Sequence, residues 1–119
     1  MSHRIAFASS DGKVVNQHFG RTQKIIVVDL LEDDYKFVEV RENTPSCVEF
    51  EHTEERLLNT VNLIKDCEAI FVAKIGKGAL SVLQRNGIKA VESPHFIVDI
   101  IDNLLHGRVK LINLLEGLR

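Results

Sequence analysis

An uninterrupted apolar stretch at residues 69–73, with the sequence AIFVA, constrains the fold more than any other part of the chain. Five consecutive apolar side chains between polar segments predict a strand that is buried on both faces of a sheet. Strands of this kind are typical of α/β proteins, in which helices cover the sheet.

The first part of the chain predicts three further strands. Apolar runs occupy residues 4–8 and 24–31, and residues 35–41 mix apolar with charged side chains, as a half-exposed edge strand does. The acidic segment 32–34 is typical of a hairpin turn. We therefore expect a three-stranded antiparallel meander.

Three helices and a fifth strand are predicted after the meander. Thr53 is a candidate N-cap for a helix that ends near residues 65–66, and a second helix follows the turn at residues 74–78 and ends at 86–87. Residues 88–91 form the fifth strand.

A serine–proline pair is expected to start the last helix. Ser93 would be its N-cap and Pro94 its first residue, Phe96 would be buried, and Gly107 would close it. The apolar tail at residues 108–119 can pack either as strand or as helix. The order β-β-β-α-β-α-β-α predicts an α/β fold with a five-stranded mixed sheet flanked by helices, in one domain over residues 1–119.

Composition excludes several functional classes. The net charge is −2, the pI is about 6.2, and Lys and Arg are scattered among acids, so we expect no nucleic-acid partner. No apolar run approaches the ~20 residues of a membrane span, and no signal peptide precedes the first strand. We therefore expect a cytoplasmic protein whose two cysteines are reduced.

The longest loop of the predicted meander is residues 9–20, which contain an Asp11-Gly12 turn signal and His18 near the end. Loops of this length in a small domain tend to carry function. The strand directions place this loop at one end of the sheet, together with residues 42–52, 74–78 and 93–95.

Side chains that bind soft metals can meet at that end. They are His18, Cys47 and His52, with His95 as a further candidate. Cys67 precedes the fourth strand and would lie roughly 17–20 Å away, so we predict a buried core thiol there.

A thiolate with imidazoles suits iron–sulfur species, zinc or copper better than magnesium or calcium. The spacing of Cys47 and His52 does not make a four-ligand structural zinc site. Taken singly, the sequence context of His18, Cys47 or His52 favours a solvated or hydrogen-bonding loop side chain over a ligand. The turn with Lys74, Gly76 and Gly78 could hold an anion at a helix N-terminus, or be only a tight turn.

Catalytic patterns are absent from the sequence. There is no Gly-x-Ser-x-Gly elbow, and the pair of Cys47 and His52 lacks a visible third group to orient the base. The first strand carries no acid before Asp11, which disfavours a metal-dependent nuclease. We therefore expect a non-enzymatic protein.

Residues 5–20, with the sequence IAFASSDGKVVNQHFG, closely resemble the opening of the dinitrogenase iron–molybdenum cofactor biosynthesis family. The resemblance continues in residues 41–47, 66–67, 74–76 and 86–88, and covers roughly residues 4–107. This family comprises small cofactor-carrier proteins and the C-terminal domain of the nitrogenase cofactor-core synthase. Lys74 stands where the family often has arginine.

The resemblance implies a ribonuclease H-like fold and non-catalytic binding of an iron–sulfur cluster or an iron–molybdenum cofactor precursor. It implies that His18 ligates the metal, and Cys47 matches a recurrent family cysteine. His52 is a third candidate from position alone, and Lys74 and Gly76 would face anionic parts of the cofactor.

The expected partners are cofactor-assembly or acceptor proteins, and a homodimer could form through the exposed third strand. The alternative function is a metal-free interaction or regulatory module on the same fold.

Overall fold

The computed structural model describes residues 3–43 and 54–106. Within them the predicted order of strands and helices is confirmed, with one added 3₁₀ turn, η1, in the long loop. The elements are β1 (His3–Ala8), η1 (Phe19–Arg21), β2 (Lys24–Leu30), β3 (Tyr35–Glu42), α1 (Glu54–Leu63), β4 (Ala69–Val72), α2 (Lys77–Arg85), β5 (Lys89–Glu92) and α3 (Ile97–Leu105).

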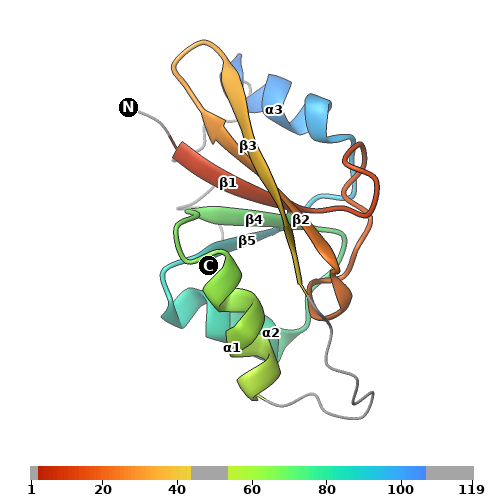
Figure 1. Ribbon diagram of the computed structural model, residues 1–119, viewed down its shortest axis with the longest axis vertical. Helices are drawn as coiled ribbons and strands as arrows, with labels where there is room; N and C mark the ends of the chain where they lie inside the picture. The colour runs from red at the N-terminus through yellow and green to blue at the C-terminus, as the bar shows by residue number, and fades with distance from the viewer. Residues whose placement is uncertain (1–2, 44–53, 107–119) are drawn as a thin grey trace.

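The five strands form one sheet in the order β3-β2-β1-β4-β5 (Figure 1). β1 pairs antiparallel with β2, which pairs antiparallel with β3, so the predicted meander is confirmed. β4 lies parallel to both β1 and β5, as two βα crossovers require. An α/β fold with a five-stranded mixed sheet is therefore the observed architecture.

Alternating side chains of the strands supply two apolar layers. Ala6, Ala8 and Ile70 belong to the layer against α1 and α2, whereas Ile5 and Phe71 belong to the layer against α3. All four residues of β4 are at most 1% exposed, which confirms that this strand is buried on both faces.

The start of the last helix differs from the prediction. α3 begins at Ile97 with Phe96 as its N-cap, and the Phe96 side chain is 56% exposed rather than buried. The cause is tertiary, because the backbone here bonds the long loop. Val15 N–H donates to the His95 carbonyl at 3.0 Å, and Ile97 N–H donates to the Lys13 carbonyl at 2.8 Å. The expected N-cap Thr53, the closing Gly107 and the tail 108–119 lie outside the described residues.

An ion-pair network is built around Asp66, in the segment between α1 and β4. Arg4 donates to both carboxylate oxygens of Asp29, at 2.8 and 3.1 Å, and to Asp66 at 2.8 Å. Arg41 donates to both oxygens of Asp66, at 2.6 and 2.8 Å, and to the Leu63 carbonyl at 2.7 Å. The network ties β1, β2 and β3 to the segment between α1 and β4.

Protonation of the carboxylates in this network should lower the stability of the protein in acid. The Arg41 guanidinium holds the pKa of Asp66 well below its usual range, and Arg4 lowers the pKa of Asp29. A lowered folded-state pKa gives stability that is complete above the unfolded pKa of about 4 and is lost as the pH falls below it. After allowing for solvent screening, we expect Asp66→Asn to lower the free energy of unfolding by about 1–2 kcal/mol at about pH 7. The variant should also lose less stability than the parent when the pH is lowered.

Urea unfolding at about pH 7 and about pH 3 measures this effect. Asp33→Asn, in the exposed turn between β2 and β3, is the matched control and should leave the stability unchanged within about 0.5 kcal/mol. An equal acid loss in the parent protein and in Asp66→Asn would contradict the assignment.

None of the helices within residues 3–43 and 54–106 has both the length and the apolar character needed to cross a bilayer.

Candidate functional site

The long loop between β1 and β2 begins with a preorganised turn. The Asp11 carboxylate accepts hydrogen bonds from the backbone N–H groups of Lys13, at 2.8 Å, and Val14, at 3.1 Å. These bonds lower the pKa of Asp11, and the Ser9 hydroxyl donates to the same carboxylate oxygen at 3.1 Å. Gly12 has φ 75°, a conformation that glycine adopts without steric cost.

The second half of the loop is fixed against the end of β4. Ala73 N–H donates to the Gln17 carbonyl at 3.0 Å, and Phe19 N–H donates to the Lys74 carbonyl at 3.0 Å. These bonds flank a parallel bridge between His18 and Lys74. The Phe19 side chain is 1% exposed and packs into the layer against α1 and α2, whereas His18 is exposed. Phe19 therefore anchors the loop and leaves His18 facing outward.

His18 and Lys74 border a cavity of about 330 Å³ at this end of the sheet. The cavity is lined by His18, Gly20, Arg21, Lys74, Ile75 and Gly76. Three predicted site residues, His18, Lys74 and Gly76, therefore meet in one place.

The remaining predicted residues are His95, Cys47 and His52. Cys47 and His52 lie outside the described residues. His95 lines a separate cavity beside α3. Arg21 also lines the cavity at His18, and it was not predicted from the sequence. The Arg21 N–H donates to the His18 carbonyl at 3.0 Å, so a short helical turn brings these two residues to the same cavity. Their three-residue spacing is the only sequence signal for it.

Two glycines keep the cavity open. Neither Gly20 nor Gly76 has a positive φ, and a Cβ at either position would meet no atom within 4 Å. Neither backbone conformation nor close packing therefore requires glycine there. The bare backbone instead leaves room for a bulky occupant.

The start of α2 adds positive potential to the site. Gly76 is the N-cap and offers no capping side chain, and the first turn carries Lys77 and no acidic residue. Helix N-termini favour anions because their first N–H groups have no partner within the helix. The Glu92 carboxylate accepts a hydrogen bond from Ile75 N–H at 2.9 Å, which holds the turn and offsets part of the positive charge.

Cys67 lies at the opposite end of β4 from the cavity, as predicted. Its side chain is 4% exposed, and burial, reinforced by Asp66, raises the pKa of the thiol to about 12. A thiol in this environment is not available as a ligand or nucleophile near neutral pH.

Within residues 3–43 and 54–106, no three side chains of His, Cys, Asp or Glu are grouped so that they could hold a metal ion. The described part of the cavity therefore offers a metal cofactor one possible ligand, the imidazole of His18. The cationic side chains of Arg21 and Lys74 can pair with negative charge on the cofactor.

A family model described as dinitrogenase iron–molybdenum cofactor matches residues 1–107. NifX of Klebsiella pneumoniae is 31% identical over 93 residues, which cover 78% of this chain and 58% of NifX. The FeMo cofactor biosynthesis protein NifB of Bradyrhizobium diazoefficiens is 34% identical over 88 residues, which cover 74% of this chain and 18% of NifB. The chain thus spans little more than half of this NifX and less than a fifth of this NifB.

Solved structures share the fold. The crystal structure of PH0822 aligns with a TM-score of 0.67 and 29% identity, over 87% of this chain and 91% of that one. The apo form of the orange protein from Desulfovibrio gigas aligns with a TM-score of 0.63 over 89% of each chain. At 18% identity, the second likeness concerns the fold alone.

Proposed function

This chain belongs to the dinitrogenase iron–molybdenum cofactor family, and from that premise we propose that it is a non-catalytic carrier in iron–molybdenum cofactor biosynthesis. Its cargo would be an iron–sulfur cofactor or a precursor of the iron–molybdenum cofactor. The observation that carries this proposal is the cavity that His18, Arg21 and Lys74 line together with Gly20 and Gly76.

The chemistry of these side chains suits such a cargo. Imidazole nitrogen is a good ligand for iron, and sulfide-rich clusters carry negative charge that arginine and lysine attract. A small set of exchangeable ligands permits reversible binding, and a carrier must release its cargo. The cavity has a volume of about 330 Å³, and there is open space beside the backbone of Gly20 and Gly76 in its lining.

We retain Cys47 as the second proposed ligand and His52 as a third candidate, although both lie outside the described residues. We also propose a single domain of ribonuclease H-like type, with the strand order β3-β2-β1-β4-β5 as support, and a cytoplasmic location without a nucleic-acid or membrane partner.

Anaerobic cluster uptake tests the carrier function, with visible absorption and iron content as readouts. We expect the parent protein to take up a cluster and His18→Ala and Cys47→Ala to take up less. The matched controls are His106→Ala, at the exposed end of α3, and Cys67→Ala, which removes a buried thiol far from the cavity. Uptake that survives both test variants would overturn the ligand assignment, and no uptake by the parent would overturn the carrier.

Gly76 offers a test in which stability and binding should separate. Asp and Asn are both better helix N-caps than glycine, so either substitution should preserve or raise stability by a few tenths of a kcal/mol. Gly76→Asp also adds a negative charge beside His18 and Lys74, and we expect cargo affinity to fall about tenfold. Gly76→Asn is the uncharged control of equal size. Equal losses in the two variants would mean that size matters rather than charge.

An exposed apolar strip favours a protein partner as well. Tyr35, Phe37 and Val40 of the edge strand β3 are 42%, 55% and 44% exposed, and all three pair with β2 residues whose side chains face the α3 layer. We propose that an assembly or acceptor protein, or a second copy of the chain, covers this strip. If the chain is instead a metal-free interaction module, Phe37→Lys should abolish partner binding while His18→Ala leaves it intact, as measured by co-purification.

A further inference from the structure

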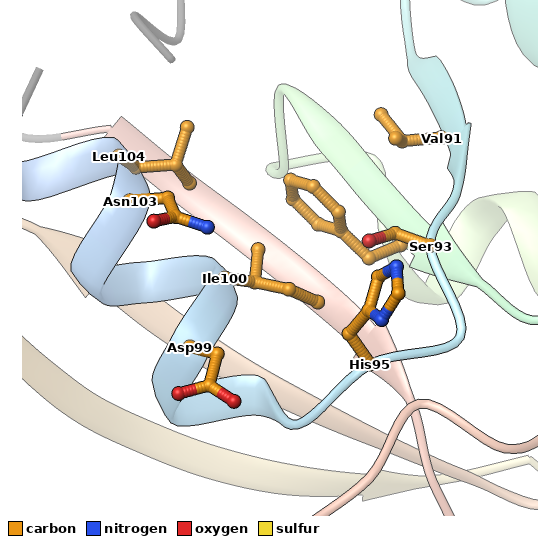
Figure 2. A pocket seen from close by; sticks show the side chains of 8 residues that line it. Val91, Ser93, His95, Asp99, Ile100, Asn103 and Leu104 are labelled. Carbon is orange, nitrogen blue, oxygen red and sulfur yellow. The ribbon is translucent and has the colours of Figure 1, made fainter. Parts of the chain in front are cut away.

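A second cavity lies on the other side of the sheet, between α3 and the ends of β4 and β5 (Figure 2). Its volume is about 290 Å³, close to the lower end of the range of about 300–1,000 Å³ for small-molecule sites. Phe71, Val91, Ile100 and Leu104 in its lining belong to the apolar layer against α3, opposite the layer that holds Phe19.

The floor of this second cavity is apolar and rigid. Phe71 is 1% exposed and stacks on Phe7 with the ring centroids 5.1 Å apart, so its ring cannot turn away without disturbing the core. Val91 and Ile100 are 8% and 7% exposed, and Figure 2 shows the Ile100 side chain extending from α3 toward the strand residues. Such a floor binds a flat or branched hydrocarbon group.

Polar side chains surround the floor. They are Ser93, His95, Asp99 and Asn103. Figure 2 places Asp99 and Asn103 on α3, and Ser93 and His95 on the segment that leads from β5 into it. Asp99 and His95 are the two titratable side chains among the described residues of this lining. The Asp99 carboxylate has no ion pair with any residue in 3–43 or 54–106. An apolar floor with a carboxylate at the rim favours a ligand that has a hydrocarbon body and a cationic head.

We propose that this cavity is a second binding site, specific for a small organic amine with an aromatic or branched aliphatic body. It is distinct from the cationic cavity at His18, which attracts anions. The opposite charges of the two linings mean that one ligand cannot satisfy both.

The long loop connects the two cavities and provides a reporter. Val15 N–H donates to the carbonyl of His95 on the rim of the second cavity, and Phe19 N–H donates to the carbonyl of Lys74 on the rim of the first. A ligand that contacts His95 should therefore shift the amide resonance of Val15.

Titration of the full-length ¹⁵N-labelled protein with 2-phenylethylamine, followed by amide chemical shifts, tests the proposal. We expect saturable shifts confined to Phe71, residues 91–104 and Val15, with a millimolar dissociation constant. The anionic probe 3-phenylpropanoate should bind at least about fivefold more weakly. Asp99→Asn should remove this preference and leave cluster uptake unchanged, so the result is independent of the carrier proposal.

Val98→Ala is the matched control, because Val98 precedes Asp99 in α3, is 61% exposed and does not line the cavity. It should bind both probes as the parent does. Absence of saturable shifts in the full chain, whether the cavity is already filled or simply lacks affinity, would overturn the proposal. Equal binding of amine and acid, or a preference that persists in Asp99→Asn, would also overturn it.

Discussion

Phe19→Ala is expected to lower the free energy of unfolding by about 3–5 kcal/mol and to weaken cargo binding at the same time. The Phe19 side chain is 1% exposed and fills the core layer between the sheet and the helices α1 and α2. Its truncation leaves a cavity that the surrounding core fills only partly, so both the transfer energy and the packing are lost.

The effect on binding follows from the position of Phe19 in the loop. His18 directly precedes Phe19, and the N–H of Phe19 donates a hydrogen bond to the Lys74 carbonyl. Without the buried ring, the segment that carries His18 and Arg21 loses its anchor, and the two side chains no longer share a fixed geometry with Lys74. Phe19→Leu should retain most of the anchor and most of the binding.

Urea unfolding and anaerobic cluster uptake measure the two effects. Phe96→Ala removes the same side chain from a site where it is 56% exposed, and it should cost less than about 1 kcal/mol. A stable Phe19→Ala variant with full uptake would contradict the role of Phe19 as an anchor.

The second large effect concerns the charge of the cavity. The double substitution Arg21→Glu and Lys74→Glu changes two positive groups in the lining to negative ones, and we expect cargo affinity to fall about a hundredfold. Both side chains are exposed and have no ion pair within the described parts of the chain, so stability should change little.

Cargo binding as a function of salt concentration measures this electrostatic contribution. The parent should bind more weakly as salt rises, and the double variant should lose most of this dependence. Lys65→Glu, on the exposed segment after α1 at the far end of the sheet, is the control for a general change in net charge. An equal loss in the control would show that the attraction is not local to the cavity.

The sequence was sufficient for those parts of the fold that depend on local pattern. The apolar run at residues 69–73 predicted the doubly buried β4, and the polar segment 32–34 predicted the turn between β2 and β3. Strand directions then placed His18 and Lys74 at one end of the sheet, where the structure bridges them. Their function as ligands remains a prediction.

The parts that depend on tertiary contacts could not be predicted in this way. Ser93 and Pro94 form a good local start signal, yet the helix starts at Ile97 because residues 95–97 bond with the loop at residues 13–15. No periodicity in either segment encodes that pairing. Arg21 was missed for a similar reason, since a three-residue helical turn leaves no amphipathic pattern.

Nitrogen hyperfine coupling to the bound cluster tests the central claim most directly. The protein has five histidines, and uniform ¹⁵N labelling of them allows pulsed paramagnetic resonance to detect a histidine nitrogen bonded to iron. We predict that the loaded parent shows this coupling and that His18→Ala, loaded with the same cluster under forcing conditions, loses it. A coupling that persists in His18→Ala, or a fully loaded parent that shows none, would contradict the assignment of His18 as the iron ligand of the carrier.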